Sequence, residues 1–328
     1  MTVLVFLDPS HPDGRIADAT KPTLMATDQG ATRGDGIFES LLAVGGVPRK
    51  MQAHLDRLGS SARALDLDIP DQDSWRRAMS TALEEFRRGI NGHAVARETG
   101  GPITAGTAAV PGTAAVSGTE APDEAVVKLI VTRGVEGSAT STAWVQVSTP
   151  PAAGKMQRET GIDVLLLDRG FDSGLAERAP WLLLGAKTLS YAVNMAALRY
   201  AHVNGADDVI FTSSDGRVLE GPTSSVLLAQ LDGEGQAQVK RLITPRLDSG
   251  ILPGTSQGAL FKAAKATGWE LGYGPLEPAD LFDADAVWLI SSIRLLAPVN
   301  RIDGKEIGSP AVRASLTAEL SELMDQAE

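Results

Sequence analysis

The sequence predicts an α/β protein organised as two domains. Its 328 residues are enough for two domains that each have a core. Short apolar runs of strand length alternate with stretches whose apolar residues recur at helical spacing. The stretch Pro150–Gly154 consists of proline and small residues and is typical of a linker. We therefore expect one domain over residues 1–150 and a second over residues 151–328.

The composition excludes several classes of function. With 43% hydrophobic residues and a net charge of -11, the chain has no basic stripe of the kind that binds nucleic acid. No apolar run reaches membrane-spanning length, and the first nine residues lack the charged start of a secretory signal. The absence of cysteine excludes disulfides, thiolate metal sites and a cysteine nucleophile, and it leads us to expect the cytoplasm. The four histidines are scattered without metal-ligand spacing, so we expect no metal.

The first organised block lies near the N-terminus. A glycine-rich bend precedes a predicted strand over Ile37–Val44, which ends in a Gly45-Gly46 hairpin turn. His54 and Arg57 lie three residues apart on one face of the helix that follows, where a solvated surface is the simplest interpretation of either residue alone. The predicted buried stripe of this amphipathic helix consists of Leu55, Leu58, Ala62 and Leu65.

Residues 89–124 differ from their surroundings. They follow a second predicted helix, Asp71–Phe86, and are low in charge and rich in glycine, alanine, threonine and proline without periodicity. We interpret them as a flexible insertion and assign them no function. Predicted strands follow at Ala125–Arg133 and Ala143–Ser148, and alternation in the first places Lys128 on a face that we expect to be partly wet.

The main chemical signal lies in the stretch from residue 180 to residue 228. The apolar run Trp181–Leu184 is predicted to be the end of a buried strand, and Lys187 follows it. Burial lowers the pKa of a lysine toward the free amine, which is the state that forms a Schiff base. Two short strands are predicted to flank an Asp215-Gly216 turn, with the carboxylate Glu220 just beyond them. Between the lysine and this hairpin a helix is predicted from apolar residues at helical spacing, namely Ala192, Met195, Ala196, Leu198 and Ala201.

An anion site is predicted at the start of a later helix. Pro253-Gly254 precede Thr255 and Ser256, which are predicted to cap this helix. The free N–H groups and the dipole of a helix start attract anions such as phosphate. Beyond it, a buried strand is predicted to end at Ser291-Ser292, and a short helix to begin at Pro310.

The sequence does not support other common catalytic motifs, because the features that they require are missing. Residues 254–258 read G-T-S-Q-G and match the G-x-S-x-G turn of serine hydrolases. However, Pro253 interrupts the strand that this turn requires, and no histidine follows Ser256. Neither a G-x-G-x-x-G after a strand nor a Walker A pattern occurs, so dinucleotide and P-loop sites are not expected.

Five motifs in register resemble the class IV family of pyridoxal-phosphate enzymes, the D-amino-acid and branched-chain aminotransferase-like proteins. The motifs are G-D-G-I-F-E with H-L-D-R-L, K-T-L-S-Y, G-A-D-D-V-I-F with G-R-V-L-E-G-P-T-S, T-P-R-L-D-S-G-I-L-P-G, and W-L-I-S-S-I-R-L-L-A-P-V. They cover roughly residues 25–305. The resemblance implies a small N-terminal α+β domain, a larger C-terminal α/β domain and pyridoxal phosphate between them. It also implies a homodimer that acts on a small-molecule amino substrate.

The resemblance gives expected roles to the residues that match family motifs. Lys187 matches the lysine that forms the Schiff base and acts as general base. Glu220 matches the carboxylate that keeps the ring nitrogen protonated, so that the ring can accept electrons from the reacting carbon. Arg57 matches the arginine whose planar fork binds the phosphate. The other expected cofactor contacts are Thr255 and Ser256 at the helix start, Ser292 and Ile293 in a second phosphate loop, and Tyr191 near the phenolic oxygen.

The expected reaction depends on details of the pocket. Phe38 stands where D-amino-acid aminotransferases tend to have tyrosine, which counts against that activity. The Ser292-Ile293 pair is closer to 4-amino-4-deoxychorismate lyases, which release pyruvate and 4-aminobenzoate for folate. Arg133 and Arg294 are candidate ligands of the substrate carboxylates, and structural salt bridges explain both arginines equally well. A branched-chain or other class IV aminotransferase is the alternative, and a non-catalytic binding protein of the same fold is a remote one.

Overall fold

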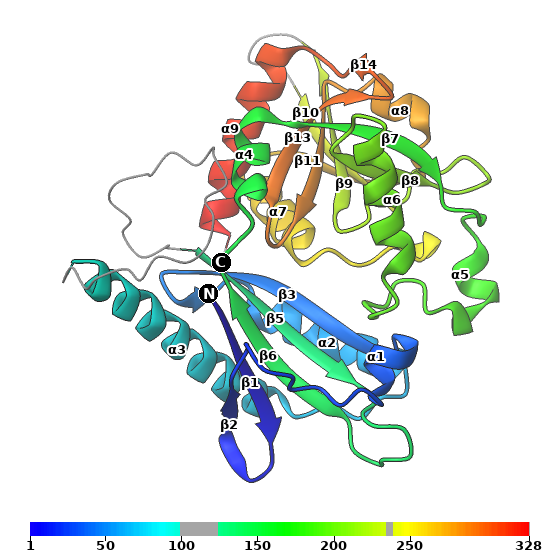
Figure 1. The fold of residues 1–328 in the computed structure, drawn as a ribbon. Coiled ribbons are helices and arrows are strands. Elements are labelled where there is room, and N and C mark those ends of the chain that lie inside the picture. Colours follow the sequence, from blue (N-terminus) through cyan, green and yellow to red (C-terminus); the bar gives the residue numbers. More distant parts are fainter. Residues whose placement is uncertain (99–123, 234–238, 328) are drawn as a thin grey trace.

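The structure is a computed structural model that describes residues 1–98, 124–233 and 239–327. Within these residues the chain forms two sheets, one built before residue 150 and one after it. Figure 1 shows the two sheets in separate halves of the molecule, with the connection running through α4 (Ala152–Thr160). The division of the chain into two domains at this point stays a prediction. No helix in the described residues is long and apolar enough to cross a membrane.

The smaller sheet is antiparallel throughout. In the described part of the chain it has six strands in the order β2-β1-β6-β5-β3-β4. The pairing of β3 with β5 places Ser40 opposite Lys128 and Phe38 opposite Ile130. The strands are β1 (Thr2–Asp8), β2 (His11–Ala17), β3 (Gly36–Val44), β4 (Val47–Pro48), β5 (Glu124–Thr132) and β6 (Thr142–Ser148).

Helices cover one face of this sheet. The stripe predicted for the first long helix is confirmed, because Leu55 and Leu58 are buried in the same core as Ile37 of β3. Since side chains alternate along a strand, Phe38 and Ser40 point to a different face from Ile37, and both line a cavity. The helices of this half are α1 (Gln29–Arg33), α2 (Met51–Ala64) and α3 (Gln72–Glu98).

The larger sheet is mixed. Counting described residues, it has eight strands, seven in the order β11-β10-β9-β12-β13-β7-β8 and β14 beside β13. Neighbours run parallel in the pairs β10–β11, β13–β7 and β7–β8 and antiparallel in the others. The strands are β7 (Ile162–Asp168), β8 (Asp208–Thr212), β9 (Ser225–Asp232), β10 (Val239–Pro245), β11 (Glu270–Gly274), β12 (Ala286–Ser291), β13 (Leu295–Ile302) and β14 (Lys305–Glu306).

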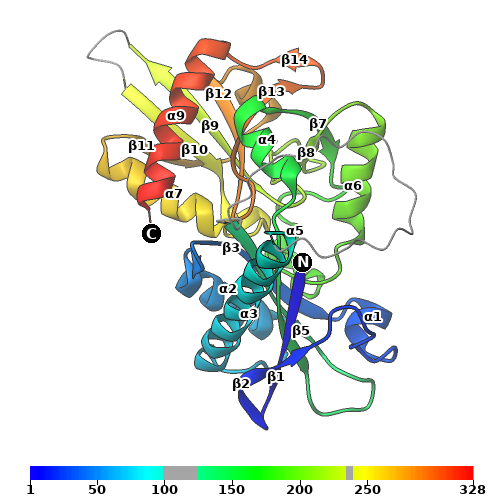
Figure 2. The ribbon, with the colours of Figure 1, turned by 60° about the vertical axis from the view of Figure 1, so that its left-hand side comes forward.

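Both faces of the larger sheet are buried. Along β9, Val226 and Leu228 belong to one core while Leu227 and Ala229 belong to another, as a period of two requires. Figure 2 shows α7 and α9 on one side of this sheet and α6 on the other. Besides α4, the helices of this half are α5 (Leu175–Arg178), α6 (Ala192–Val203), α7 (Thr255–Ala266), α8 (Pro278–Phe282), α9 (Pro310–Gln326) and the 3-10 helices η1 (Pro180–Leu182) and η3 (Leu247–Ser249).

The expectation of a buried strand at Trp181–Leu184 is wrong. Part of this run forms η1, and the Trp181 side chain is 74% exposed. Pro180 at the start of η1 fixes a helical backbone angle and offers no N–H to a strand ladder. The chain first pairs with the smaller sheet at Thr188, through an isolated bridge to Ile37. The lysine is therefore delivered by a loop.

The predicted hairpin around Asp215-Gly216 is also incomplete. Its first strand is β8, and the returning chain pairs with it through an isolated bridge between Val218 and Thr212 and through backbone hydrogen bonds such as Phe211 N–H to the Glu220 carbonyl at 2.9 Å, but it does not form a second full strand. At the turn itself, the Ser173 N–H and hydroxyl donate to the Asp215 carboxylate at 2.9 and 2.7 Å.

Two segment boundaries differ from expectation. α3 continues to Glu98, so residues 89–98 are helical rather than part of an insertion. Residues 94–98, A-V-A-R-E, include strong helix formers, which accounts for the extension. The rest of the predicted insertion, 99–123, lies outside the described residues. The predicted linker is shorter than expected, because α4 already begins at Ala152.

Candidate active site

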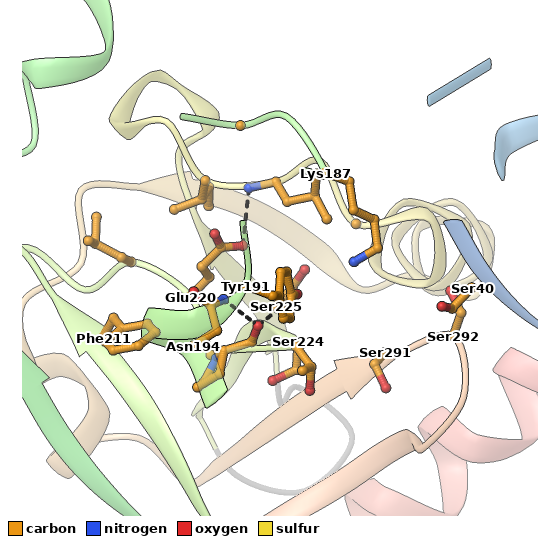
Figure 3. Close-up of a pocket in the computed structure, with 18 of the residues that line it drawn as sticks. Ser40, Lys187, Tyr191, Asn194, Phe211, Glu220, Ser224, Ser225, Ser291 and Ser292 are labelled. Carbon is orange, nitrogen blue, oxygen red and sulfur yellow. Dashed lines mark hydrogen bonds between the residues drawn. The ribbon is translucent and has the colours of Figure 1, made fainter. Parts of the chain in front are cut away.

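A cavity of about 630 Å³ is lined by residues from both halves of the molecule. Lys187, Glu220 and Arg57, which are far apart in the sequence, all line it. Figure 3 shows Lys187 pointing into the space between Glu220 on one side and Ser292 on the other. The other predicted site residues that line the cavity are Phe38, Tyr191, Thr255, Ser256, Ser292, Ile293 and Arg294.

Lys187 lies in the loop between η1 and α6 and is tied to the smaller sheet by its main chain. The Phe38 N–H donates to the Lys187 carbonyl at 3.1 Å, and the Lys187 N–H donates to Ser61 Oγ at 3.0 Å. Its Nζ lies 4.4 Å from the ring centroid of Phe38 and 5.5 Å from that of Tyr191. Burial, followed by the charge of Arg57, lowers the pKa of Lys187 to about 8. Far more of this amine is neutral near pH 7 than is the case for an exposed lysine.

Glu220 lies beyond the turn that follows β8. The Leu252 N–H donates to its Oε2 at 3.1 Å (Figure 3). Burial raises the pKa of Glu220 to about 7, against the opposing effects of this N–H and of the Lys187 and Arg169 charges. A cationic N–H placed against this carboxyl would restore its charged form and make a strong hydrogen bond.

Aromatic rings form the cavity wall next to the lysine. Phe38 and Tyr191 meet edge to face, with ring centroids 5.3 Å apart. The Tyr191 hydroxyl donates to the Pro222 carbonyl at 2.9 Å, and Asn194 Nδ2 donates to the same oxygen at 2.7 Å. Burial raises the pKa of Tyr191 to about 12, so the hydroxyl stays protonated. Contact between Tyr191 and a cofactor stays a prediction.

Arg57 lines the cavity and is not on a solvated helix surface, the simplest interpretation of this residue taken alone. Its side chain is 11% exposed, and its Nε and Nη2 donate to the two carboxylate oxygens of Glu39 at 2.7 and 2.8 Å. Its Nη1 donates to the Pro253 carbonyl at 2.7 Å. A guanidinium has five N–H groups, so one on each Nη is left for a ligand.

His54 is fully buried, so the solvated interpretation is wrong for this residue too. Its Nδ1 lies 2.7 Å from Glu39 Oε2, and its Nε2 lies 3.2 Å from both Thr255 Oγ1 and Ser292 Oγ. Burial raises the pKa of Glu39, but the hydrogen bonds and charges of Arg57 and His54 outweigh it and lower that pKa to about 2. Because an ionised carboxylate only accepts, His54 Nδ1 is the donor in this pair. Burial lowers the pKa of His54 despite the opposing effect of Glu39, which leaves Nε2 as an acceptor.

α7 begins at the cavity. Its N-cap is Gly254, and Thr255 and Ser256 are its first helical residues, so the predicted capping role is wrong. Their hydroxyls instead face Ser292 in the turn after β12, with O–O distances of 3.1 and 3.3 Å. A Cβ at Gly254 would lie 2.5 Å from Ser225 Oγ and 3.1 Å from the Cβ of Gln257, so a side chain here would require these neighbours to shift. The first N–H groups of a helix have no partner within it, so this end attracts an anion.

The cations of the region differ in their partners. Arg133 does not line the cavity, and its Nε donates to Asp35 Oδ2 at 2.7 Å. Arg294 lines the cavity and pairs with Asp208 at 2.7 Å. Lys128 is half-buried and lines the cavity, and the described residues offer it no ion pair or hydrogen bond. Of these three cations, Lys128 is therefore the one that is most available to a ligand.

These residues fit a cofactor that carries an aldehyde, a basic ring nitrogen and a phosphate. Lys187 offers a partly neutral amine, Glu220 a carboxyl group, and Arg57 two unused N–H groups. Five buried polar atoms of the wall have no hydrogen-bond partner among the described residues, namely Ser224 Oγ, Gln257 Nε2, Arg169 Nη1, Arg294 Nε and Arg294 Nη2, although the last forms an ion pair with Asp208. Such atoms are expected where a polar ligand completes a site.

Sequence reasoning missed Glu39. This residue lies in an apolar strand, where alternation puts it on the same buried face as Ile37 and Leu41. A carboxylate on a core face requires a charged or hydrogen-bonding partner. The sequence offered the signal, because His54 and Arg57 share one face of the helix that follows.

Comparisons with known proteins agree with this geometry. Residues 36–302 match the family described as amino-transferase class IV. A bifunctional aminodeoxychorismate lyase / D-amino acid transaminase of Mycobacterium tuberculosis is 41% identical over 315 residues, which cover 96% of each chain. The PLP-bound form of a hypothetical aminotransferase from Mycobacterium tuberculosis is 39% identical, with a TM-score of 0.80 over 100% of this chain and 98% of that one. A fold IV-transaminase from Curtobacterium pusillum is 38% identical, with a TM-score of 0.80 over 99% of each chain.

Proposed function

The chain belongs to the class IV aminotransferase family, whose members use pyridoxal phosphate, and we propose that it is a 4-amino-4-deoxychorismate lyase. The observation that carries the proposal is one cavity lined by the partly neutral amine of Lys187, the carboxyl of Glu220 and the ammonium of Lys128, which has no partner among the described residues. The lyase activity in the name of the relative at 41% identity supports it as well.

Four parts of the cavity would hold the cofactor. Lys187 would bind its aldehyde carbon, and Glu220 its ring N–H. Arg57 and the start of α7 would bind its phosphate. Bound in this way, pyridoxal phosphate supplies an acceptor for the electron pair of a bond broken next to the substrate amine.

The chain itself contributes a base at a defined atom. Lys187 Nζ, with a pKa of about 8, removes the proton from the ring carbon that carries the substrate amine. The C–O bond on the neighbouring ring carbon breaks, the departing enolpyruvate takes up a proton to become pyruvate, and the ring becomes aromatic. Phe38 and Tyr191 keep water from one side of the amine, which strengthens the electrostatic interactions there.

The substrate of this lyase carries two carboxylates. Besides Lys187 and Arg57, which are assigned to the cofactor, the described residues of the cavity wall include three cations, Lys128, Arg169 and Arg294. Arg169 donates to Asn194 and lies over the ring of Phe211, whereas Lys128 has no partner among the described residues and Arg294 has a buried Nε without a hydrogen-bond partner there. We assign one substrate carboxylate to Lys128 and the other to Arg294. Arg133 is not part of this assignment, because its guanidinium is engaged by Asp35 away from the cavity.

Amino-acid transamination is the second candidate, in keeping with the expected alternative. The observation that favours it is the double name of the relative at 41% identity, which includes D-amino acid transaminase. The same Lys187 amine serves either reaction, because both begin by removing a proton from the carbon that carries the amine. Phe38 beside the lysine stays an argument against D-amino acids.

Two incubations of the holoenzyme separate the two reactions. Holoenzyme is given 4-amino-4-deoxychorismate without any keto acid, and pyruvate and 4-aminobenzoate are measured. Release of the two products in equal amounts supports the lyase. Absence of release, together with amino transfer from D-alanine or a branched-chain amino acid to 2-oxoglutarate, overturns the lyase proposal in favour of the second candidate.

We also propose that two copies of the chain associate through η1 and α6. Val193, Tyr200 and Val203 are exposed and lie at helical spacing on α6. Trp181 of η1, in the same half of the molecule, is exposed as well. Exposed apolar patches of this kind mark interaction surfaces. Met195 of α6 lines the cavity, so a second copy here would lie close to the site. A cytoplasmic location stays a prediction.

A further inference from the structure

We propose that Glu39 and His54 are positioning residues that prepare the phosphate end of the cofactor site. Neither residue lines the cavity, so both act through other groups. The inference rests on the assignment of the cofactor phosphate to Arg57 and the start of α7. It concerns how these donors are held in place before the cofactor binds.

Glu39 sets the direction of the Arg57 fork. Both carboxylate oxygens of Glu39 accept hydrogen bonds from Arg57. A third N–H of Arg57, on Nη1, donates to the carbonyl of Pro253, just before α7. The guanidinium is thus held between β3 and the start of α7. The guanidinium has therefore lost its rotamer freedom before a phosphate binds, and two of its N–H groups have no partner among the described residues and can bind the phosphate.

His54 connects the same carboxylate to the hydroxyl groups at the start of α7. Because Nδ1 donates to Glu39, Nε2 accepts a hydrogen from Thr255 or Ser292, which lie 3.2 Å away. Thr255 belongs to α7 and Ser292 to the turn between β12 and β13, and their oxygens are 3.1 Å apart. One buried carboxylate therefore fixes three sets of donors that come from separate segments.

A purely structural role explains this arrangement poorly. Ile37 and Leu41, on the same face of β3, fill their positions with apolar side chains. A buried ionised carboxylate with charged partners is usually no more stabilising than a well-packed apolar group of similar size. Positioning a ligand-binding constellation through a supporting layer of hydrogen bonds is a recurrent reason to keep such a group.

The test compares the affinity of the full-length apo-protein for pyridoxal phosphate with its affinity for pyridoxal, which lacks the phosphate. The dissociation constant for pyridoxal divided by that for pyridoxal phosphate reports on the phosphate end alone. A general loss of stability affects both constants and cancels in this ratio. We expect Glu39→Gln and His54→Asn to lower this ratio about tenfold, as the loss of an oriented charged hydrogen bond requires. Asp35→Asn, which breaks the Arg133 pair outside the cavity, is the matched control and keeps the wild-type ratio.

Two substitutions at one position separate positioning from packing. The amide of His54→Asn can still donate to Glu39 but cannot reach the hydroxyls, whereas the longer His54→Gln places an amide oxygen near the Nε2 position. We expect His54→Gln to stay within about threefold of the wild-type ratio. The proposal is overturned if Glu39→Gln and His54→Asn keep the wild-type ratio. It is also overturned if the two His54 variants lower the ratio equally. The measurement involves no turnover, so an error in the proposed reaction leaves its result unchanged.

Discussion

Phe38 holds Lys187 at both ends of the lysine. Its N–H donates to the Lys187 carbonyl at 3.1 Å, and its ring centroid lies 4.4 Å from Nζ. Phe38 belongs to the smaller sheet, whereas the lysine loop leads into α6 of the other half. The reactive amine is therefore placed by contacts that cross from one sheet to the other.

Replacing this ring is expected to make the amine less basic. The negative face of an aromatic ring favours the ammonium form, so Phe38→Leu lowers the pKa of Lys187 by about half a unit. The measurement is the pH dependence of Lys187 acylation in the apo-protein, followed by mass spectrometry. Phe211→Leu, whose ring contacts Arg169, is the control and leaves the value unchanged. An unchanged or raised pKa in Phe38→Leu contradicts the assigned contact.

Glu220 gives the apo-protein a pH-dependent stability. The folded protein keeps a proton on Glu220 up to about pH 7, whereas the ordinary value for this group is 4.5. Between these values the unfolded chain binds fewer protons, so stability falls as pH rises. Relative to Glu220→Gln, the free energy of unfolding of the wild-type protein should fall by up to about 3 kcal/mol between pH 4.5 and pH 7. Urea unfolding of both apo-proteins across this pH range measures this difference. If the free energy of unfolding has the same pH dependence in both proteins, the raised pKa of the buried Glu220 carboxyl is contradicted.

Lys128 is expected to bind substrate rather than cofactor. Its ammonium lines the cavity without a partner among the described residues, so Lys128→Met should raise KM about tenfold or more through the loss of a charged contact. Cofactor affinity should stay unchanged, as measured by titration of the apo-protein. Arg133→Met, outside the cavity, is the control with an unchanged KM. Equal effects of the two substitutions would refute the assignment of Lys128.

The surface of η1 and α6 is expected to determine the oligomeric state. Val203 is 86% exposed on α6, and Val203→Glu would place a charge in the proposed contact between two copies. Light scattering at micromolar concentration should then show a dimer for the wild-type chain and a monomer for the variant. Val47→Glu, at an exposed position of β4, should remain dimeric. A monomeric wild-type protein, or a dimeric Val203→Glu variant, would contradict the proposal that this surface is the dimer interface.

Sequence patterns predicted the chemistry of the site better than its supporting contacts. Lys187, Glu220 and Arg57 were identified by residue type, order and resemblance, and all three line one cavity. The partners of Arg57 were not identified, because Glu39 meets it only when β3 and α2 pack together. Local patterns record periodicity and turns, whereas a contact between segments depends on tertiary packing.

The same limit explains the error at Trp181–Leu184. Four apolar residues in a row indicate burial only when another segment covers them, and the described chain leaves Trp181 exposed. In contrast, Leu55 and Leu58 were predicted correctly because a helical stripe specifies its own buried face. The sequence predicts a partly wet position for Lys128 but no site, since nothing in its strand indicates the cavity beside it.

The central claim is that Lys187 binds the cofactor covalently. The most direct measurement is borohydride reduction of the holoenzyme, followed by proteolysis and mass spectrometry of the modified peptide. The account predicts a single reduced cofactor adduct on Lys187, and no adduct in Lys187→Ala. An adduct on another lysine such as Lys128, or an unmodified Lys187 in a protein that retains bound cofactor, would contradict it.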